Sequence, residues 1–270
     1  MELDSESVNA FQDKIMEWWK KNVRDLPWRK EPDPYHVLVS EIMLQQTQVN
    51  RVVPKYHEFL QEFPTIQDLA SAEKKHLLAV WSGLGYNRRA LWLREAAAEI
   101  VKRGEFPRNE TELRKLKGIG DYTSRSIMIF AFNEDIAAVD TNIRRVFIAS
   151  GFADETMSSK EIQSIAEKLL LKGRSRDWHN ALMDYGAQVL TSNVTGIAPL
   201  TRQPCFRGSS REIRGVIIKV LTASDRLTLN QLVSSLEVEC GIHDVESIMD
   251  QLISDGLVKS AGNKEYQIAD

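Results

Sequence analysis

Apolar residues recur at spacings of three and four along most of the chain, which is the period of an amphipathic helix. The segments 37–49, 77–81 and 165–170 carry this pattern most clearly, and period-two alternation occurs only near the C-terminus. Glycine and proline punctuate the helical stretches, as they do at the ends of short helices. The pattern therefore predicts a mainly α protein of about ten short helices.

A change of composition falls at residues 191–210, which are rich in serine, threonine, glycine and proline and show no hydrophobic period. Such a stretch is typical of a loop or linker. Three helical segments and a short hairpin follow it, which is the pattern of a winged helix. We therefore expect a main domain over 1–205 and a winged-helix module over 206–270.

The composition narrows the class of protein. The chain has 270 residues, 43% of them apolar and 27% charged, so it can bury a core and should be globular. Its net charge of −3 provides no overall field for nucleic acid, although a local basic stripe remains compatible with that value. No apolar run is long enough to span a bilayer and no targeting segment is present. These features predict a cytoplasmic (nucleoid-associated) or nuclear protein that does not enter a membrane.

A glycine turn stands out in the middle of the chain. Gly118 and Gly120 can both adopt a positive φ, which would point successive N–H groups toward an anion at the start of the next helix. Lys117 and Arg125 flank the turn, so a phosphodiester is the anion that we expect there. A plain corner between two helices is the alternative, and Asp140 beyond the following helix favours the anion site.

Turn, helix and Asp140 together resemble the helix-hairpin-helix DNA glycosylase superfamily. The segments 24–49, 81–93 and 180–187 are similar to the adenine DNA glycosylases, which act on adenine mispaired with guanine or 8-oxoguanine. The similarity covers about residues 11–190. It implies a two-lobed helical fold and a monomeric, monofunctional base excision repair enzyme whose partner is double-stranded DNA with a mispaired adenine.

The resemblance also implies a role for three residues. Glu41 would be the general acid that protonates the flipped adenine, and burial on its apolar helix would raise its pKa. Asp140 would stabilise the cationic sugar or add to it, and it could also cap the next helix. Tyr122 stands where lyase-type relatives carry a Schiff-base lysine, so we expect no strong lyase activity, and its phenol could hydrogen-bond Asp140.

Further positions match the family's base pocket and DNA contacts. Gln46, Thr47 and Tyr86 match residues that wedge into the emptied base stack. The base pocket is predicted to comprise Arg24, Trp28, Arg29, Leu44, Asn180 and Met183. The DNA-binding residues are predicted to be Gln46, Thr47, Leu84, Tyr86, Lys117, Gly118, Gly120 and Thr123.

The chain departs from the family pattern in several places. Leu190 occupies the position of the first iron–sulfur ligand, and two cysteines in the whole chain cannot supply four thiolates. We therefore predict that the cluster is absent and that the protein uses no other metal or cofactor. The segment after 205 is too short for the 8-oxoguanine-recognition domain of many relatives. Asn180 stands where adenine-specific relatives often have Glu or Gln. The resemblance therefore supports the removal of a base more strongly than it supports adenine as the base that is removed.

The segment from Phe206 to Asp270 contains 7 Lys or Arg and 10 Asp or Glu. Its expected third helix carries four acids and no basic residue, which argues against reading a DNA groove. We expect the module to pack against the catalytic body or a protein partner instead. Two other functions remain open: a thymine or uracil mismatch glycosylase on the same scaffold, and a non-catalytic lesion-binding protein.

Overall fold

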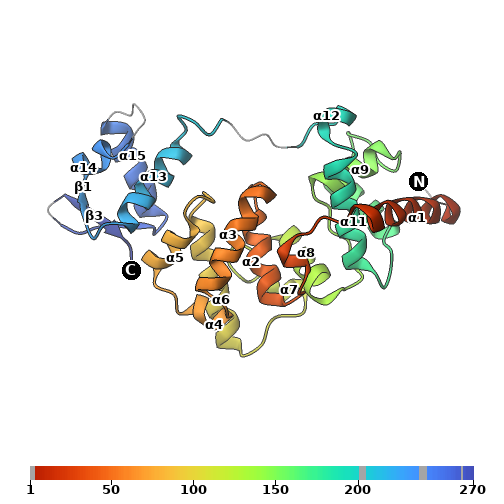
Figure 1. The fold of residues 1–270 in the computed structure, drawn as a ribbon, viewed down its shortest axis with the longest axis horizontal. Coiled ribbons are helices and arrows are strands. Elements are labelled where there is room, and N and C mark those ends of the chain that lie inside the picture. Colours follow the sequence, from red (N-terminus) through yellow and green to blue (C-terminus); the bar gives the residue numbers. More distant parts are fainter. Residues whose placement is uncertain (1–3, 201–204, 237–241, 263) are drawn as a thin grey trace. The chain divides into compact units, whose positions relative to one another are not determined.

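The computed structural model describes residues 4–200, 205–236, 242–262 and 264–270, and it confirms a mainly helical protein (Figure 1). The chain forms two compact units. The first comprises Met1–Glu41, Pro107–Lys115 and Ile119–Arg202, and the second comprises Ile42–Phe106, Leu116–Gly118 and Gln203–Asp270. The proposed domain boundary after residue 205 stays a prediction. Among the described residues, no helix is both long and apolar enough to cross a membrane.

In the part of the first unit that the structure describes, every regular element is a helix. Its elements are α1 (Ser5–Asn22), the 3-10 helix η1 (Pro27–Arg29), most of α2 (Pro34–Leu44), α7 (Glu110–Leu113), α8 (Asp121–Phe132), α9 (Thr141–Ala149), α10 (Ser159–Lys168), α11 (Ser175–Gln188) and α12 (Ser192–Thr195). Asp33 caps the start of α2, because its carboxylate accepts the N–H groups of Tyr35 at 2.8 Å and His36 at 3.1 Å. Pro34 then supplies a helical φ at the first position.

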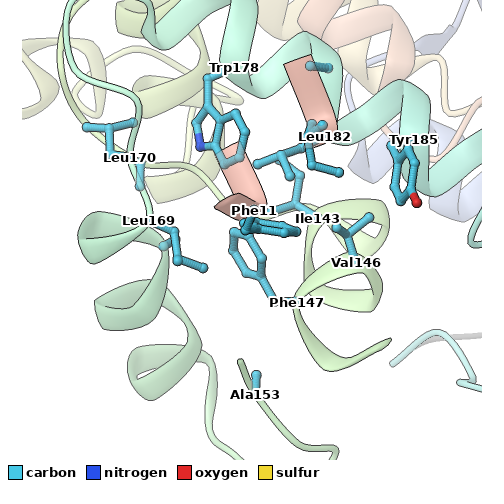
Figure 2. Packing of buried hydrophobic residues seen from close by; sticks show 14 of the residues in the cluster. Phe11, Ile143, Val146, Phe147, Ala153, Leu169, Leu170, Trp178, Leu182 and Tyr185 are labelled. Carbon is cyan, nitrogen blue, oxygen red and sulfur yellow. The ribbon is translucent and has the colours of Figure 1, made fainter. Parts of the chain in front are cut away.

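The core of the first unit lies between α1, α9 and α11 (Figure 2). The rings of Phe11 and Trp178 meet edge to face, with centroids 5.7 Å apart, and Phe147 and Leu182 fill the space beside them. Burying each such side chain contributes about 1.5–3 kcal/mol. Gly186 lets α11 approach α9 closely, because a Cβ there would meet the Asn142 carbonyl oxygen at 2.9 Å. This packing fixes the position of the first turn of α9, where Asp140 lies.

The second unit joins two groups of elements. Residues 42–106 contribute α3 (Val49–Glu62), α4 (Ile66–Ala70), α5 (Lys74–Trp81) and α6 (Arg88–Arg103). Residues 205–270 contribute α13 (Ser210–Thr222), β1 (Leu227–Thr228), α14 (Leu229–Ser234), α15 (Ile242–Ser254), β2 (Val258–Ser260) and β3 (Glu265–Ile268).

The three strands form an antiparallel sheet in the order β1-β3-β2. Leu227 pairs with Tyr266, and Val258 pairs with Ile268. The hairpin β2–β3 follows the prediction, whereas β1 was not predicted because a two-residue strand leaves no readable alternation. Ile217 and Leu221 of α13 are buried beneath these elements.

Candidate active site

Glu41 lies in the apolar body of α2 and is only 9% exposed. Its neighbours Val39 and Ile42 are buried too, so a place on a polar helix face is ruled out. The Ser126 hydroxyl, from α8, donates a hydrogen bond of 2.7 Å to Glu41 Oε2. Burial raises the pKa of Glu41 to about 7, the Ser126 bond lowers it, and the charge of Asp140 raises it. The carboxyl can therefore hold a proton at neutral pH and give it up.

Asp140 is the N-cap of α9. Its Oδ1 accepts the N–H of Ile143 at 2.7 Å, and its Oδ2 accepts from Asn142 Nδ2 at 2.9 Å. Burial raises the pKa of Asp140, and the bonds from Ile143 and Asn142 work against that rise because they favour the charged form. The carboxylate is thus both a helix cap and an oriented acceptor beside open space.

Arg145 extends the contacts of Asp140 to the end of α11. Its Nη2 donates to Asn142 Oδ1 and to the Gly186 carbonyl, each at 2.7 Å, and its Nε donates to the Leu190 carbonyl. The side chain is buried. A chain of hydrogen bonds therefore runs from the Asp140 carboxylate to the segment that follows α11.

Tyr122 lies in the first turn of α8 and is half-buried. Burial raises its pKa, and the charges of Glu41 and Asp140 raise it further, so the phenol stays neutral. Among the described residues its hydroxyl makes no hydrogen bond with Asp140; the expected contact is therefore absent there, because Ile143 and Asn142 serve the carboxylate instead. Tyr122 and Asp140 nonetheless line one cavity of about 310 Å³, together with Arg144, Gln163 and Leu200.

Two residues of the predicted base pocket, Arg24 and Arg29, bind Asp184 of α11. Arg29 makes a bidentate pair with the carboxylate, with Nη1 to Oδ2 at 2.8 Å and Nη2 to Oδ1 at 2.9 Å, and Arg24 Nε binds Oδ1. Trp19 Nε1 donates to Oδ2 at 3.0 Å. Burial works to raise the pKa of Asp184, but Arg29 and Arg24 outweigh it and lower that pKa. Their guanidinium groups are thus anchored, and their role in reading a base stays a prediction.

The remaining pocket residues lie in different surroundings. Asn180 is 7% exposed on α11, and Met183 is partly buried against the core of the first unit. Trp28 belongs to η1. Leu44 is the last residue of α2 and belongs to the second unit.

Two turns of the second unit carry the predicted wedge residues. Gln46 and Tyr86 both adopt a left-handed backbone, with φ of 57° and 48°, and the Tyr86 side chain is exposed. Arg89, only 5% exposed, holds the two turns: its Nη2 donates to Thr47 Oγ1 at 3.0 Å in the first turn and to the Gly85 carbonyl at 3.2 Å in the second.

The side chain of Leu84 is buried within its turn, which leaves little of it for a DNA contact. The Leu84 carbonyl instead accepts hydrogen bonds from Thr47 and Arg89.

The glycine turn before α8 differs from the prediction at one residue. Gly118 has the expected positive φ of 77°, whereas Gly120 has φ −96° and is the N-cap of α8. A Cβ at Gly118 would press on Trp92 at 3.2 Å, but a Cβ at Gly120 would meet nothing within 4 Å. Lys117 is exposed and Thr123 is buried. The backbone at Gly120 therefore faces open space at the start of α8.

Comparison with known proteins identifies the family. Residues 39–172 match the HhH-GPD superfamily of base excision DNA repair proteins. An adenine DNA glycosylase of Mycolicibacterium smegmatis is 33% identical over 279 residues, which cover 94% of this chain and 94% of the relative. The chain belongs to the adenine DNA glycosylase family. The sequence-based resemblance is thereby confirmed.

Other members of the family are longer. The adenine DNA glycosylase of Rattus norvegicus is 39% identical over 203 residues, which cover 70% of this chain and 39% of the rat protein. Among solved structures, a thermostable thymine-DNA glycosylase matches with a TM-score of 0.63 and 29% identity, covering 69% of this chain and 88% of that one. A complex of endonuclease III with DNA matches with a TM-score of 0.63 at 20% identity, covering 74% and 91%, which supports the fold alone.

The residues present do not fit the iron–sulfur cluster that the family implies. Leu190 stands at the first ligand position, and its carbonyl binds Arg145. Cys205 is exposed, while Cys240 lies outside the described residues. In the described part of the chain, no group of three or more His, Cys, Asp or Glu residues could hold a metal ion. The absence of a cluster remains a prediction, since relevant thiol positions lie partly beyond that range.

Several residues of the site were not found from the sequence. The functional carboxylates and arginines are contacted by Ser126, Asn142 and Asp184. Arg89 holds the turns of Gln46 and Tyr86, here called the wedge turns. A serine on the apolar side of α8, four residues after Tyr122, was a readable signal for Ser126. Asp184 offered none, because its partners lie about 160 residues earlier in the chain.

Proposed function

We propose that this chain is a monofunctional DNA glycosylase that removes adenine mispaired with guanine or 8-oxoguanine by hydrolysing the N-glycosidic bond. The observation that carries the proposal is the buried Glu41 carboxyl, with a pKa raised to about 7 and with Asp140 close enough to affect it. A proton donor and an anion whose charge acts on it meet the two needs of purine loss: neutralising the leaving base and stabilising the sugar cation.

In the first step, Glu41 gives its proton to the ring nitrogen that adenine presents on its major-groove edge. The bond between the base and the sugar then breaks, its electron pair goes to the base, and neutral adenine leaves. Such acid catalysis supplies about 10²–10⁴ in rate. Ser126 orients the Glu41 carboxyl for this transfer.

In the second step, the Asp140 carboxylate stabilises the positive charge left on the sugar. Water adds to the anomeric carbon and releases one proton, which balances the proton given to adenine. The donors Ile143 and Asn142 support Asp140 in its charged form, which this step requires.

Tyr122 supports the absence of lyase chemistry, because a phenol cannot form an imine with the abasic sugar. Wild-type protein should leave an intact abasic strand that breaks only after hot alkali. A Tyr122→Lys variant places an amine there and should be trapped on DNA by borohydride. Wild-type protein trapped in the same way would contradict the monofunctional assignment.

The wedge turns and the glycine turn before α8 both suit a DNA partner. Gln46, Thr47 and Tyr86 would enter the stack after the adenine flips out, a step that costs a few kcal/mol. The start of α8 at Gly120, preceded in the chain by Lys117, would receive a DNA phosphate.

A thymine or uracil mismatch glycosylase is the second candidate, and the 29% identity to a thymine-DNA glycosylase favours it. Glu41 weighs against this candidate, because a pyrimidine has no ring nitrogen equivalent to the one that it would protonate. A non-catalytic lesion-binding protein would have no use for a buried acid of raised pKa.

The test is single-turnover strand cleavage after hot alkali, across duplexes with every mispair and with 8-oxoguanine opposite adenine. Excision of adenine opposite guanine or 8-oxoguanine is the expected result. Excision of thymine or uracil alone would favour the second candidate, and DNA binding without any excision would favour the third.

We also propose five properties that accompany this function. The three helices and three-stranded sheet of 206–270 support a winged helix, and a domain boundary after 205 would give an independently folding module. We propose a monomer acting in the nucleoid or nucleus, where its DNA substrate is. We propose a protein without iron–sulfur cluster, which elemental analysis of anaerobically prepared protein tests.

A further inference from the structure

The charge of the C-terminal segment is unevenly distributed. Residues 207–219 contain four basic side chains, Arg207, Arg211, Arg214 and Lys219, and a single acid. The remaining residues 220–270 contain three basic side chains and nine acidic ones. The acidic balance of the whole segment therefore hides a basic stretch on α13, and phosphates respond to local charge.

Within the second unit, α13 lies beside the turn that presents Tyr86. Arg211 Nη1 donates a hydrogen bond of 2.9 Å to the Tyr86 hydroxyl, and its guanidinium carbon lies 5.7 Å from the centroid of that ring. Two ion pairs hold the segment there: Lys75 with Asp225 at 3.0 Å, and Arg88 with Asp255 at 3.1 Å.

Two cavities separate α13 from the wedge turns. They have volumes of about 660 and 580 Å³, and both are lined by Gln46, Tyr86, Arg211 and Gly215. Together their walls include six basic and two acidic residues, so they are net positive although the whole chain is net negative. Asp255 offsets part of this charge, because it pairs with Arg88 and Arg214. No carboxylate pairs with Arg51 or Lys219 in the described part of the chain.

We propose that α13 is a further part of the DNA-binding site, in which Arg211 and Lys219, with Arg51 in the same cavity, bind phosphates of the strand next to the wedge turns. This inference rests on the proposed function, because it takes the turns of Gln46 and Tyr86 as the place where DNA is distorted. It assigns DNA contact to the first helix of the segment and none to the acidic α15. It revises the expectation from net charge that the whole segment stays away from DNA.

The test uses full-length protein with Glu41→Gln, which prevents turnover, and a duplex carrying adenine opposite 8-oxoguanine. The variants are Arg211→Gln with Lys219→Gln, and as matched control Arg226→Gln with Lys259→Gln, which removes two charges of the same segment outside the cavities. Affinity is measured by fluorescence anisotropy from 50 to 200 mM salt. Loss of two phosphate contacts should reduce the slope of log affinity against log salt by about 1.8. The control pair should keep the parental slope.

A third variant, Arg211→Lys with Lys219→Arg, keeps both charges but loses the geometry of the Tyr86 contact. It should retain the parental slope, which separates phosphate binding from packing on Tyr86. Thermal melting of each variant identifies any loss of fold. An unchanged slope for Arg211→Gln with Lys219→Gln in folded protein would overturn the proposal. If wild-type protein excises no adenine but the slope still falls, the proposed function fails and the binding surface stands.

Discussion

Two buried carboxyl groups of the first unit have opposite properties. Glu41 meets one hydroxyl, from Ser126, and its pKa is raised to about 7. Asp184 is fully buried and meets two guanidinium groups and an indole N–H, and its pKa is lowered. Burial acts in the same direction on both, so the partners decide the outcome. The first environment suits a proton donor, and the second makes a permanent anion that joins α11 to the segment around η1.

The largest expected effect of breaking this contrast is on catalysis. Glu41→Gln keeps the shape of the side chain but removes the proton, so the single-turnover rate of adenine excision should fall by about 10²–10⁴. Affinity for the duplex should stay within a few-fold. Glu17→Gln, at an exposed position of α1, is the matched control and should leave the rate unchanged. Retention of more than about a tenth of the rate by Glu41→Gln would contradict the role of acid.

Asp184→Asn should act on stability instead. It leaves two arginines without their anion, and breaking a buried pair costs about 3–5 kcal/mol in the free energy of unfolding. Urea denaturation measures this cost. Asp177→Asn on the same helix removes an exposed partner of Arg174 and should cost less than about 1 kcal/mol. Equal effects of the two substitutions would show that Asp184 is not an anchor.

The pH dependence should carry the signature of Glu41. Its pKa is raised from 4.5 in the unfolded chain to about 7, so stability from the neutral carboxyl is fully present below pH 4.5 and lost as pH rises through about 7. The loss corresponds to about 3 kcal/mol. Unfolding free energies of wild type and Glu41→Gln, compared between pH 5 and 8, should diverge in favour of the variant. Parallel curves would mean that Glu41 titrates normally.

The smallest effect is expected at Ser126. Its hydrogen bond lowers the pKa of Glu41, so Ser126→Ala should move the fall of the excision rate to higher pH. Ser124→Ala removes another buried hydroxyl of α8, which donates to the Asp121 carbonyl, and it should leave the pH profile in place. A shift to lower pH in Ser126→Ala would reverse the assigned role of the hydroxyl.

Residues whose surroundings are local could be predicted from the sequence. The cap role of Asp140 followed from its place before a helix. The burial and raised pKa of Glu41 were expected from its apolar helical run only together with the family resemblance, because the pattern alone also allowed a surface glutamate. The helical fold followed from the hydrophobic period, and the family followed from the resemblance of several motifs. Partners far apart in the chain could not be found, because one sequence does not reveal which side chains meet in space. The ion pair of Asp184 with Arg29 and the hydrogen bonds of Arg89 to two turns are such contacts.

The backbone conformation of individual residues could not be predicted from the sequence either. Two glycines in Gly118-Ile119-Gly120 read alike, yet only Gly118 takes a positive φ, because Gly120 becomes the extended N-cap of α8. The difference arises from where the helix begins, which a single sequence places only to within a few residues.

Asp140 caps α9 and is also proposed to stabilise the sugar cation, and this combination bears on how the protein could evolve. Asparagine caps a helix about as well as aspartate, so Asp140→Asn should leave α9 and the surrounding core in place while removing the charge that the sugar cation needs. If the chain acts as we propose, a descendant that still binds a mispaired adenine but no longer cleaves its bond to the sugar is therefore one substitution away. The same helix end that makes the enzyme stable would make such a loss of activity easy to tolerate.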